Sequence, residues 1–155
     1  MANQRALWEQ AFGGHAEAIA FVELLADISQ TWDDLVDEDA NVPRERVDAA
    51  FFDALVALPR NPFYREHFDA LSPLVEMAAL DWLTATDFER EPAGDVARRQ
   101  HLLTLSMGLR DNLAAVAVKC VSLLRGPLAA RHWSTVIREA VMNEPLAEYL
   151  AEFAE

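Results

Sequence analysis

Hydrophobic residues recur along the chain every three to four positions, which is the spacing of α-helices that bury one face in a core. The segment 43–58 shows this clearly, because Val47, Phe51 and Leu55 follow one another at steps of about one helical turn. No stretch of alternating Thr, Val or Ile is long enough to predict a strand. The pattern therefore predicts an all-α protein.

Glycine and proline divide this pattern into separate segments. Gly13-Gly14, Pro59 and Gly126-Pro127 interrupt the hydrophobic repeat, and Ser72-Pro73 has the sequence of a helix start. We expect a single helical domain over residues 1–155, built as a bundle of six to eight helices. The expected helices cover about 3–12, 15–36, 43–58, 62–70, 73–89, 96–125, 127–143 and a short segment after Pro145.

The segment at about 96–125 is apolar on nearly every side, and we expect it to be the central helix of the bundle. Arg110, Asp111 and Asn112 interrupt it near its midpoint. Three successive helical residues cover roughly 300° of the circumference, so at least one of them points inward. A buried arginine requires a carboxylate partner, because an unpaired buried charge is strongly unfavourable.

Two interpretations of this polar interruption remain open. In the first, Arg110 forms an internal ion pair that fixes how the helices pack, with Asp34 or Asp27 as the expected partner. In the second, Asp111 completes an acidic metal site, and Arg110 binds a phosphate group.

The densest group of carboxylates lies at the end of the second expected helix. Asp33 and Asp34 each lie about one turn before Asp37, and Asp27 continues the polar side upstream. Mg²⁺ is commonly held by one or two carboxylates together with substrate phosphates. The cluster, with Asp111, is therefore a candidate metal site. The alternative is a solvated acidic end of a helix.

Composition narrows the classes of function. The chain is 52% hydrophobic and carries a net charge of −13, so its surface disfavours nucleic acid and anionic membranes as partners. The most apolar segment contains Arg110, Asp111 and Lys119 and is too polar to span a membrane. Cys120 is the one cysteine, and the N-terminus has no signal-peptide core, so we expect a cytoplasmic protein.

Two resemblances bear on function. Residues 33–37 read D-D-L-V-D, which resembles the aspartate-rich motif of isoprenoid diphosphate synthases, an all-α family that holds Mg²⁺-diphosphate. The match covers five residues, and the second motif of that family is absent. The segments 32–37 and 58–64 (LPRNPFY) together look like parts of small uncharacterised helical proteins of tailed bacteriophages and prophages. That resemblance implies that the protein acts in the cytoplasm of a bacterium during infection.

The sequence therefore supports two hypotheses. The first is a small helical accessory or interaction protein, encoded by a phage or a bacterium, that acts through protein–protein contacts or self-association and needs no cofactor. The alternative is a Mg²⁺-dependent enzyme or binder for a phosphorylated small molecule, such as a nucleotide or diphosphate. All four tryptophans fall at apolar helical positions and are expected in the core, and an exposed one would indicate a partner surface. They are Trp8, Trp32, Trp82 and Trp133.

Overall fold

A computed structural model describes residues 2–36, 41–92, 94–110 and 112–153. The described residues are 86% helical and form no strand, which confirms the predicted all-α bundle. Seven of the described helices have nine or more residues. The helices are α1 (Ala2–Ala11), α2 (Ala16–Val36), α3 (Arg44–Phe52), the π-helix η1 (Asp53–Ala57), α4 (Leu58–Arg60), α5 (Pro62–Glu66), α6 (Phe68–Arg90), α7 (Val96–Arg110), α8 (Leu113–Arg125), α9 (Pro127–Val141) and α10 (Leu146–Glu152).

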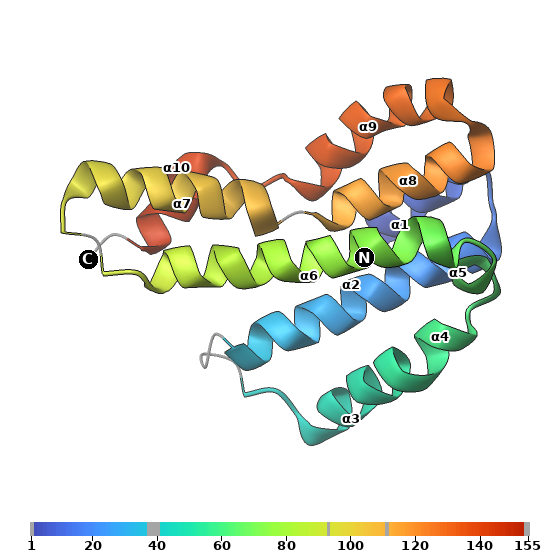
Figure 1. The fold of residues 1–155 in the computed structure, drawn as a ribbon, viewed down its shortest axis with the longest axis horizontal. Helices are drawn as coiled ribbons and strands as arrows, with labels where there is room; N and C mark the ends of the chain where they lie inside the picture. The colour runs from blue at the N-terminus through green and yellow to red at the C-terminus, as the bar shows by residue number, and fades with distance from the viewer. Residues whose placement is uncertain (1, 37–40, 93, 111, 154–155) are drawn as a thin grey trace.

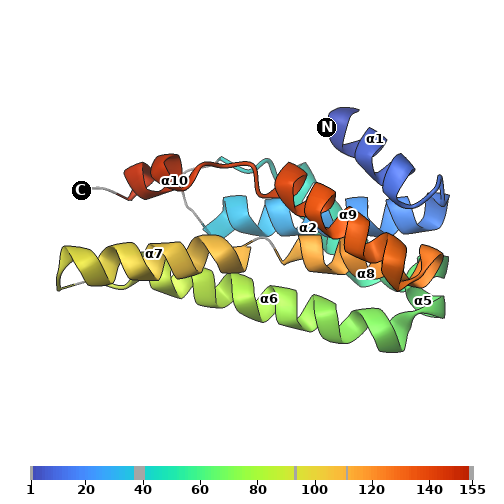
Figure 2. The same cartoon turned by 90° about the horizontal axis from the view of Figure 1, so that it is seen from above.

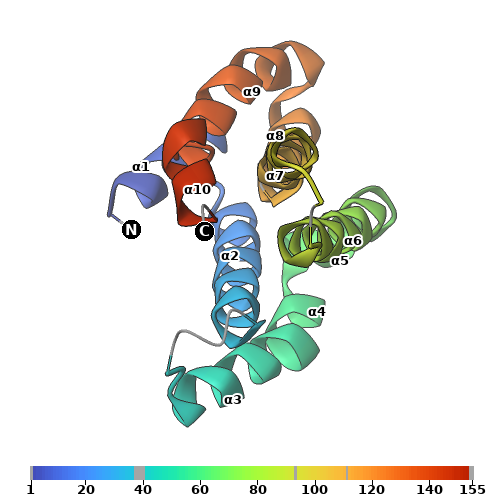
Figure 3. The same cartoon turned by 90° about the vertical axis from the view of Figure 1, so that its left-hand side faces the viewer.

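The long helices lie side by side along the length of the molecule (Figure 1). Helix α6 runs beside both α7 and α8, which follow each other nearly end to end (Figure 2). Helix α9 folds back on α8, and α2 lies in the middle of the bundle (Figure 3). The continuous segment α3–η1–α4 lies at one edge, where it packs against α2. Within the described residues, each helix is too short or too polar to cross a bilayer.

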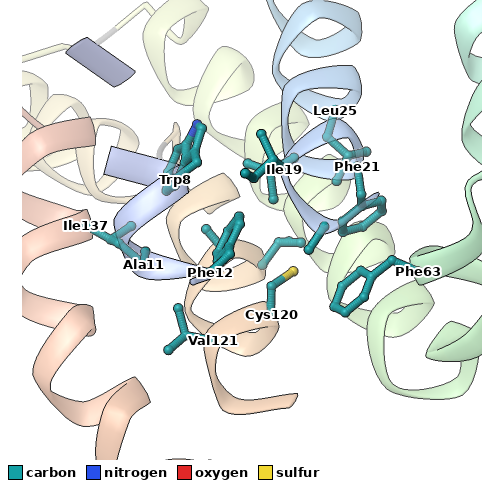
Figure 4. Close-up of a cluster of buried hydrophobic side chains, with 14 of the residues drawn as sticks. Trp8, Ala11, Phe12, Ile19, Phe21, Leu25, Phe63, Cys120, Val121 and Ile137 are labelled. Carbon is teal, nitrogen blue, oxygen red and sulfur yellow. The ribbon is translucent and has the colours of Figure 1, made fainter. Parts of the chain in front are cut away.

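The main hydrophobic core lies between α1, α2, α5, α6, α8 and α9 (Figure 4). Phe21 is fully buried and stacks on Tyr64, with 5.0 Å between the ring centroids. Trp8 stacks on Phe12 at 5.6 Å at the end of α1, and both rings belong to the buried core, which attaches α1 to the bundle. Cys120 is also fully buried, and burial raises the pKa of its thiol to about 12. The thiol therefore serves as a small apolar core group.

The expected central helix at 96–125 is two helices, because α7 ends at Arg110 and α8 begins at Leu113. Arg110 bonds to Glu89 and Asn112 bonds to Asp81, and both acceptors lie on α6. Two residues that are two positions apart point roughly 200° apart on a continuous helix, so they could not both reach α6. The break between α7 and α8 allows both polar side chains to face the same neighbour.

The predicted helix start at Ser72-Pro73 is also wrong, because Pro73 lies inside α6. The chain turns earlier, at His67, which separates α5 from α6. By contrast, the predicted start before Pro62 is confirmed: Asn61 accepts a hydrogen bond from the backbone N–H of Tyr64 at 2.9 Å. The amide of Asn61 also donates to the carbonyl of Glu17 at 2.9 Å, which ties this turn to α2.

Candidate functional site

A buried polar cluster joins α6, α7 and α10, and we define it as Glu89, Ser106, Arg110 and Tyr149. The Nε and Nη2 atoms of Arg110 each donate to Glu89 at 2.6 Å, which makes a two-pronged ion pair. The hydroxyls of Ser106, at 2.6 Å, and Tyr149 also bond to Glu89. A further bond of 3.2 Å runs from Nη1 of Arg110 to Asp33 on α2.

Helix geometry places the members of the cluster together. Ser106 and Arg110 are four residues apart on α7 and so share one face. Glu89 lies in the last turn of α6, directly opposite that face. Tyr149 is the buried residue of α10 and reaches both Glu89 and the oxygen of Ser106, the latter at 2.8 Å. The cluster therefore attaches the short helix α10 to the α6–α7 pair.

Electrostatics keep this cluster charged inside the protein. The Glu89 side chain is only 5% exposed. Burial alone would raise the pKa of Glu89, but hydrogen bonds from Arg110, Ser106 and Tyr149 outweigh it and hold the pKa below its ordinary value. Burial opposes the charge on Arg110, yet the Glu89 carboxylate raises the pKa of the guanidinium. Burial and Glu89 together raise the pKa of Tyr149, so its phenol stays protonated.

This shift predicts how acid affects stability. A carboxyl group whose pKa is lower in the folded state adds stability above its ordinary value, here 4.5, and that stability is lost as pH falls through the folded-state pKa. Glu89→Gln removes the titration at this position. Urea unfolding of both chains at about pH 7 and about pH 3 should therefore show a stability difference that narrows in acid. A difference that stays constant over this range would contradict the assignment.

The prediction that Arg110 pairs with Asp34 or Asp27 is wrong. The predicted helix, α2, does supply a carboxylate, but from another residue. The carboxylate that α2 supplies is Asp33, which also accepts a bond of 3.0 Å from the indole N–H of Trp82. Asp34 points elsewhere and accepts from Arg46 at 2.5 Å and from Gln30 at 2.9 Å. These two contacts, Gln30 first, lower the pKa of Asp34.

The predicted metal site falls partly outside the described residues, because Asp37 and Asp111 lie there. Within the described ranges, no group of three or more acidic, histidine or cysteine side chains could hold a metal ion. Asp33 and Asp34 are held by different partners, as described above, so they do not converge. The metal site and the phosphate-binding role of Arg110 stay predictions.

Sequence reasoning did not find Glu89, Ser106 and Tyr149 as partners of Arg110. The pattern places Glu89 at the end of the expected helix at 73–89 and Tyr149 in the short helix after Pro145, and it assigns neither of them a polar contact. One usable signal was present: Ser106 and Arg110 lie one turn apart on an otherwise apolar helix. That spacing indicates a shared polar face, although it does not identify the residue opposite. Every buried polar side-chain atom in the described residues has a hydrogen-bond partner, so the cluster is complete without a ligand.

A second feature lies on the surface of α3–η1. We call Phe51, Phe52 and Leu55 the apolar stripe; they are 61%, 61% and 73% exposed. None of the residues of α3, η1 and α4 is buried. The prediction that all four tryptophans lie in the core is wrong for Trp32 on α2, which is 38% exposed although its ring lies 4.4 Å from that of Trp82. Trp8 is buried, and the other two tryptophans are half-buried.

The π-helix η1 has a wider turn than its neighbours and contains Leu55 of the stripe. Its bond from the Leu58 N–H to the Asp53 carbonyl spans five residues and makes a wider turn than an α-helix. Pro59 follows directly, and a proline ring inside a helix clashes with the carbonyl four residues earlier, here that of Leu55. The wider turn gives this ring room without ending the helix.

Comparison of the chain with protein-family models, with curated proteins and with solved structures found no match in any of the three.

Proposed function

We propose that this protein is a small accessory or interaction protein that binds another protein through the apolar stripe. The observation that supports this most strongly is the exposure of Phe51, Phe52 and Leu55 on a helix that buries no residue. Large apolar side chains grouped on a surface indicate a contact site, whereas single exposed ones need no explanation. Phenylalanine is also among the aromatic residues enriched in protein interfaces.

The pattern of α3–η1 supports the same proposal. One face, with Val47 and Ala54, is half-buried and packs toward α2, and the stripe forms a second apolar face. A helix that is apolar on more than one side is normally buried on more than one side. Among the described helices, this segment packs mainly against α2, and its α4 end packs against α5. The exposed side chains of the stripe therefore remain available for a partner.

The charge around the stripe favours a partner whose contact surface is apolar and near neutral. Over residues 44–60, three arginines and three acidic residues balance each other, although the whole chain carries −13. The segment therefore has no net negative charge that would attract a basic partner. Specificity would come from shape and apolar contact. The charged residues are Arg44, Glu45, Arg46, Asp48, Asp53 and Arg60.

A photo-crosslinking residue at position 55 tests this proposal in the cells that naturally express the chain. We expect a discrete adduct with another protein, and we expect Phe51→Gln with Phe52→Gln to remove it. The matched control is position 100, an exposed site on α7. The free energy of unfolding of the double variant should change by about 1 kcal/mol or less, since surface substitutions change it by about 0.5 kcal/mol each. Equal adducts at both positions, or none at position 55, would contradict the proposal.

The cellular setting is also a proposal. The resemblance to small helical proteins of tailed phages supports a bacterial cytoplasm, and a phage or bacterial gene, as the source. The alternative of a Mg²⁺-dependent enzyme or binder for a phosphorylated small molecule stays a prediction, because Asp37 and Asp111 lie outside the described residues. In the described part of the chain, Arg110 is held in the buried polar cluster and also bonds to Asp33, and no residue is assigned a catalytic role.

A further inference from the structure

The charges of the chain are divided unevenly between its surfaces. Residues 113–141, which form α8 and α9, contain four basic residues and one acidic residue. The rest of the chain therefore carries a net charge of −16 within the total of −13. Opposite charges on separate surfaces of one molecule can attract a second copy of it.

The exposed side of α9 carries two arginines against one acidic residue, Glu139. Arg131 and Arg138 are exposed and take part in no ion pair among the described residues. Leu128, one turn before Arg131, is 84% exposed. An open hollow of about 500 Å³ lies on this side of the helix, lined by Leu128, Arg131, His132, Thr135 and Val136.

The exposed side of α6 has the opposite character. Residues 68–89 contain five acidic residues and no Lys or Arg. Asp69 and Glu76 are exposed and belong to no ion pair within the described ranges. Leu80, one turn after Glu76, is 48% exposed. This side therefore combines acidic and apolar groups without any basic residue.

We propose that α9 of one copy docks in an antiparallel orientation on α6 of another copy. Asp69 and Glu76 are seven residues apart, as are Arg131 and Arg138, which is about 10.5 Å along each helix. The antiparallel register that pairs Arg138 with Asp69 and Arg131 with Glu76 also brings Leu128 beside Leu80. A parallel register with two ion pairs would place Leu128 opposite Glu66 instead. Charge and apolar contact therefore agree only in the antiparallel arrangement.

Helices α6 and α9 each pack against α8 and lie apart in the bundle (Figure 3), so the contact requires a second molecule. The contact is heterologous, because one copy contributes α9 and the next contributes α6. Such head-to-tail contacts generate open chains of molecules, or closed rings where the rotation from each copy to the next adds up to a full turn. The contact does not involve the apolar stripe, so it is separate from the proposed function.

Charge exchange tests this contact by sedimentation equilibrium. At low salt and about 0.1–1 mM chain, a range suited to a contact of one helix with one helix, we expect a mass above the 17.3 kDa of one chain. Added salt should lower the mass, because the ion pairs are exposed. Arg131→Glu with Arg138→Glu should give monomers, and so should Asp69→Arg with Glu76→Arg. The chain with all four substitutions should associate again.

The two double variants, in which only one side of the contact has its charges reversed, also distinguish specific pairing from general repulsion between negatively charged chains. We call them the half-exchanged chains. The first becomes more negative, at −17, and the second becomes less negative, at −9. General repulsion predicts that the second associates more strongly than the original chain, whereas the proposed contact predicts a monomer. Circular dichroism checks that each chain is folded.

Three outcomes would overturn the proposal: a monomeric original chain, association that persists in both half-exchanged chains, or a fully exchanged chain that stays monomeric. Association that is lost only on Phe51→Gln with Phe52→Gln would assign self-contact to the apolar stripe instead.

Discussion

Glu89→Leu is expected to lower the free energy of unfolding by about 3 kcal/mol, near the lower end of the range for breaking a buried ion pair. The substitution leaves the guanidinium of Arg110 with one carboxylate, Asp33, at 3.2 Å. The expected loss of stability is near the lower end of that range because 24% of the Arg110 side chain is exposed, so water partly solvates the unpaired charge. Arg110→Leu should have a larger effect, about 3–5 kcal/mol, because it leaves the more deeply buried Glu89 charged and without its ion pair.

The double variant Glu89→Leu with Arg110→Leu should be more stable than either single variant. Replacing both members of a buried ion pair by apolar groups is often neutral or stabilising. The neighbours keep partners in this case, because Ser106 donates to the carbonyl of Ala85 at 3.1 Å and bonds to Tyr149 at 2.8 Å. Urea unfolding of the four chains gives the coupling energy between positions 89 and 110.

Additive effects in this cycle would contradict the structural role of the pair. If the double variant lost as much stability as the two single variants together, then the two side chains would act independently. A coupling energy of about 2 kcal/mol or more would support direct contact, since contacting pairs show about 0.5–3 kcal/mol.

The second large effect is expected at Phe21 in the main core. Phe21→Ala should lower the free energy of unfolding by about 3–5 kcal/mol, the usual range for removing a fully buried phenylalanine ring. The ring is fully buried, and it contacts Tyr64 at 5.0 Å and Phe63 at 6.2 Å between centroids. The cavity would therefore open at the point where α2 and α5 meet.

Phe51→Ala is the matched control, because it removes the same atoms from the exposed stripe. It should lower the free energy of unfolding by no more than about 1 kcal/mol, mostly through the burial that the ring retains. Thermal or urea unfolding measures both variants in the same way. Similar losses at positions 21 and 51 would mean that the stripe is part of the core and not a surface for a partner.

Sequence reasoning predicted most helices because the signals are local. The hydrophobic period and the sequence around Asn61-Pro62 concern residues within a few positions of each other. The break between α7 and α8 depends instead on where α6 lies, since Arg110 and Asn112 both bond to that helix. Helix α6 likewise includes Pro73 because it begins earlier, after the turn at His67, and that turn has no strong sequence signal.

The buried polar cluster could be predicted only in part. The requirement that Arg110 have a carboxylate follows from the energy of burying a charge, and it correctly directed attention to α2. The main partner, Glu89, lies 21 residues before Arg110, and Tyr149 lies 60 residues after Glu89. A choice among 26 acidic residues depends on how the helices pack, and the helical period does not contain that information.

The Glu89–Arg110 pair has a structural role between α6 and α7, whereas contact with a partner takes place on the apolar stripe. The most direct measurement places the photo-crosslinking residue at position 55 in the Glu89→Leu, Arg110→Leu chain. If the claim is right, this folded chain gives the same adduct in the same yield as the original chain. A folded chain that gives no adduct would show that the polar cluster itself takes part in the function, and would contradict the claim.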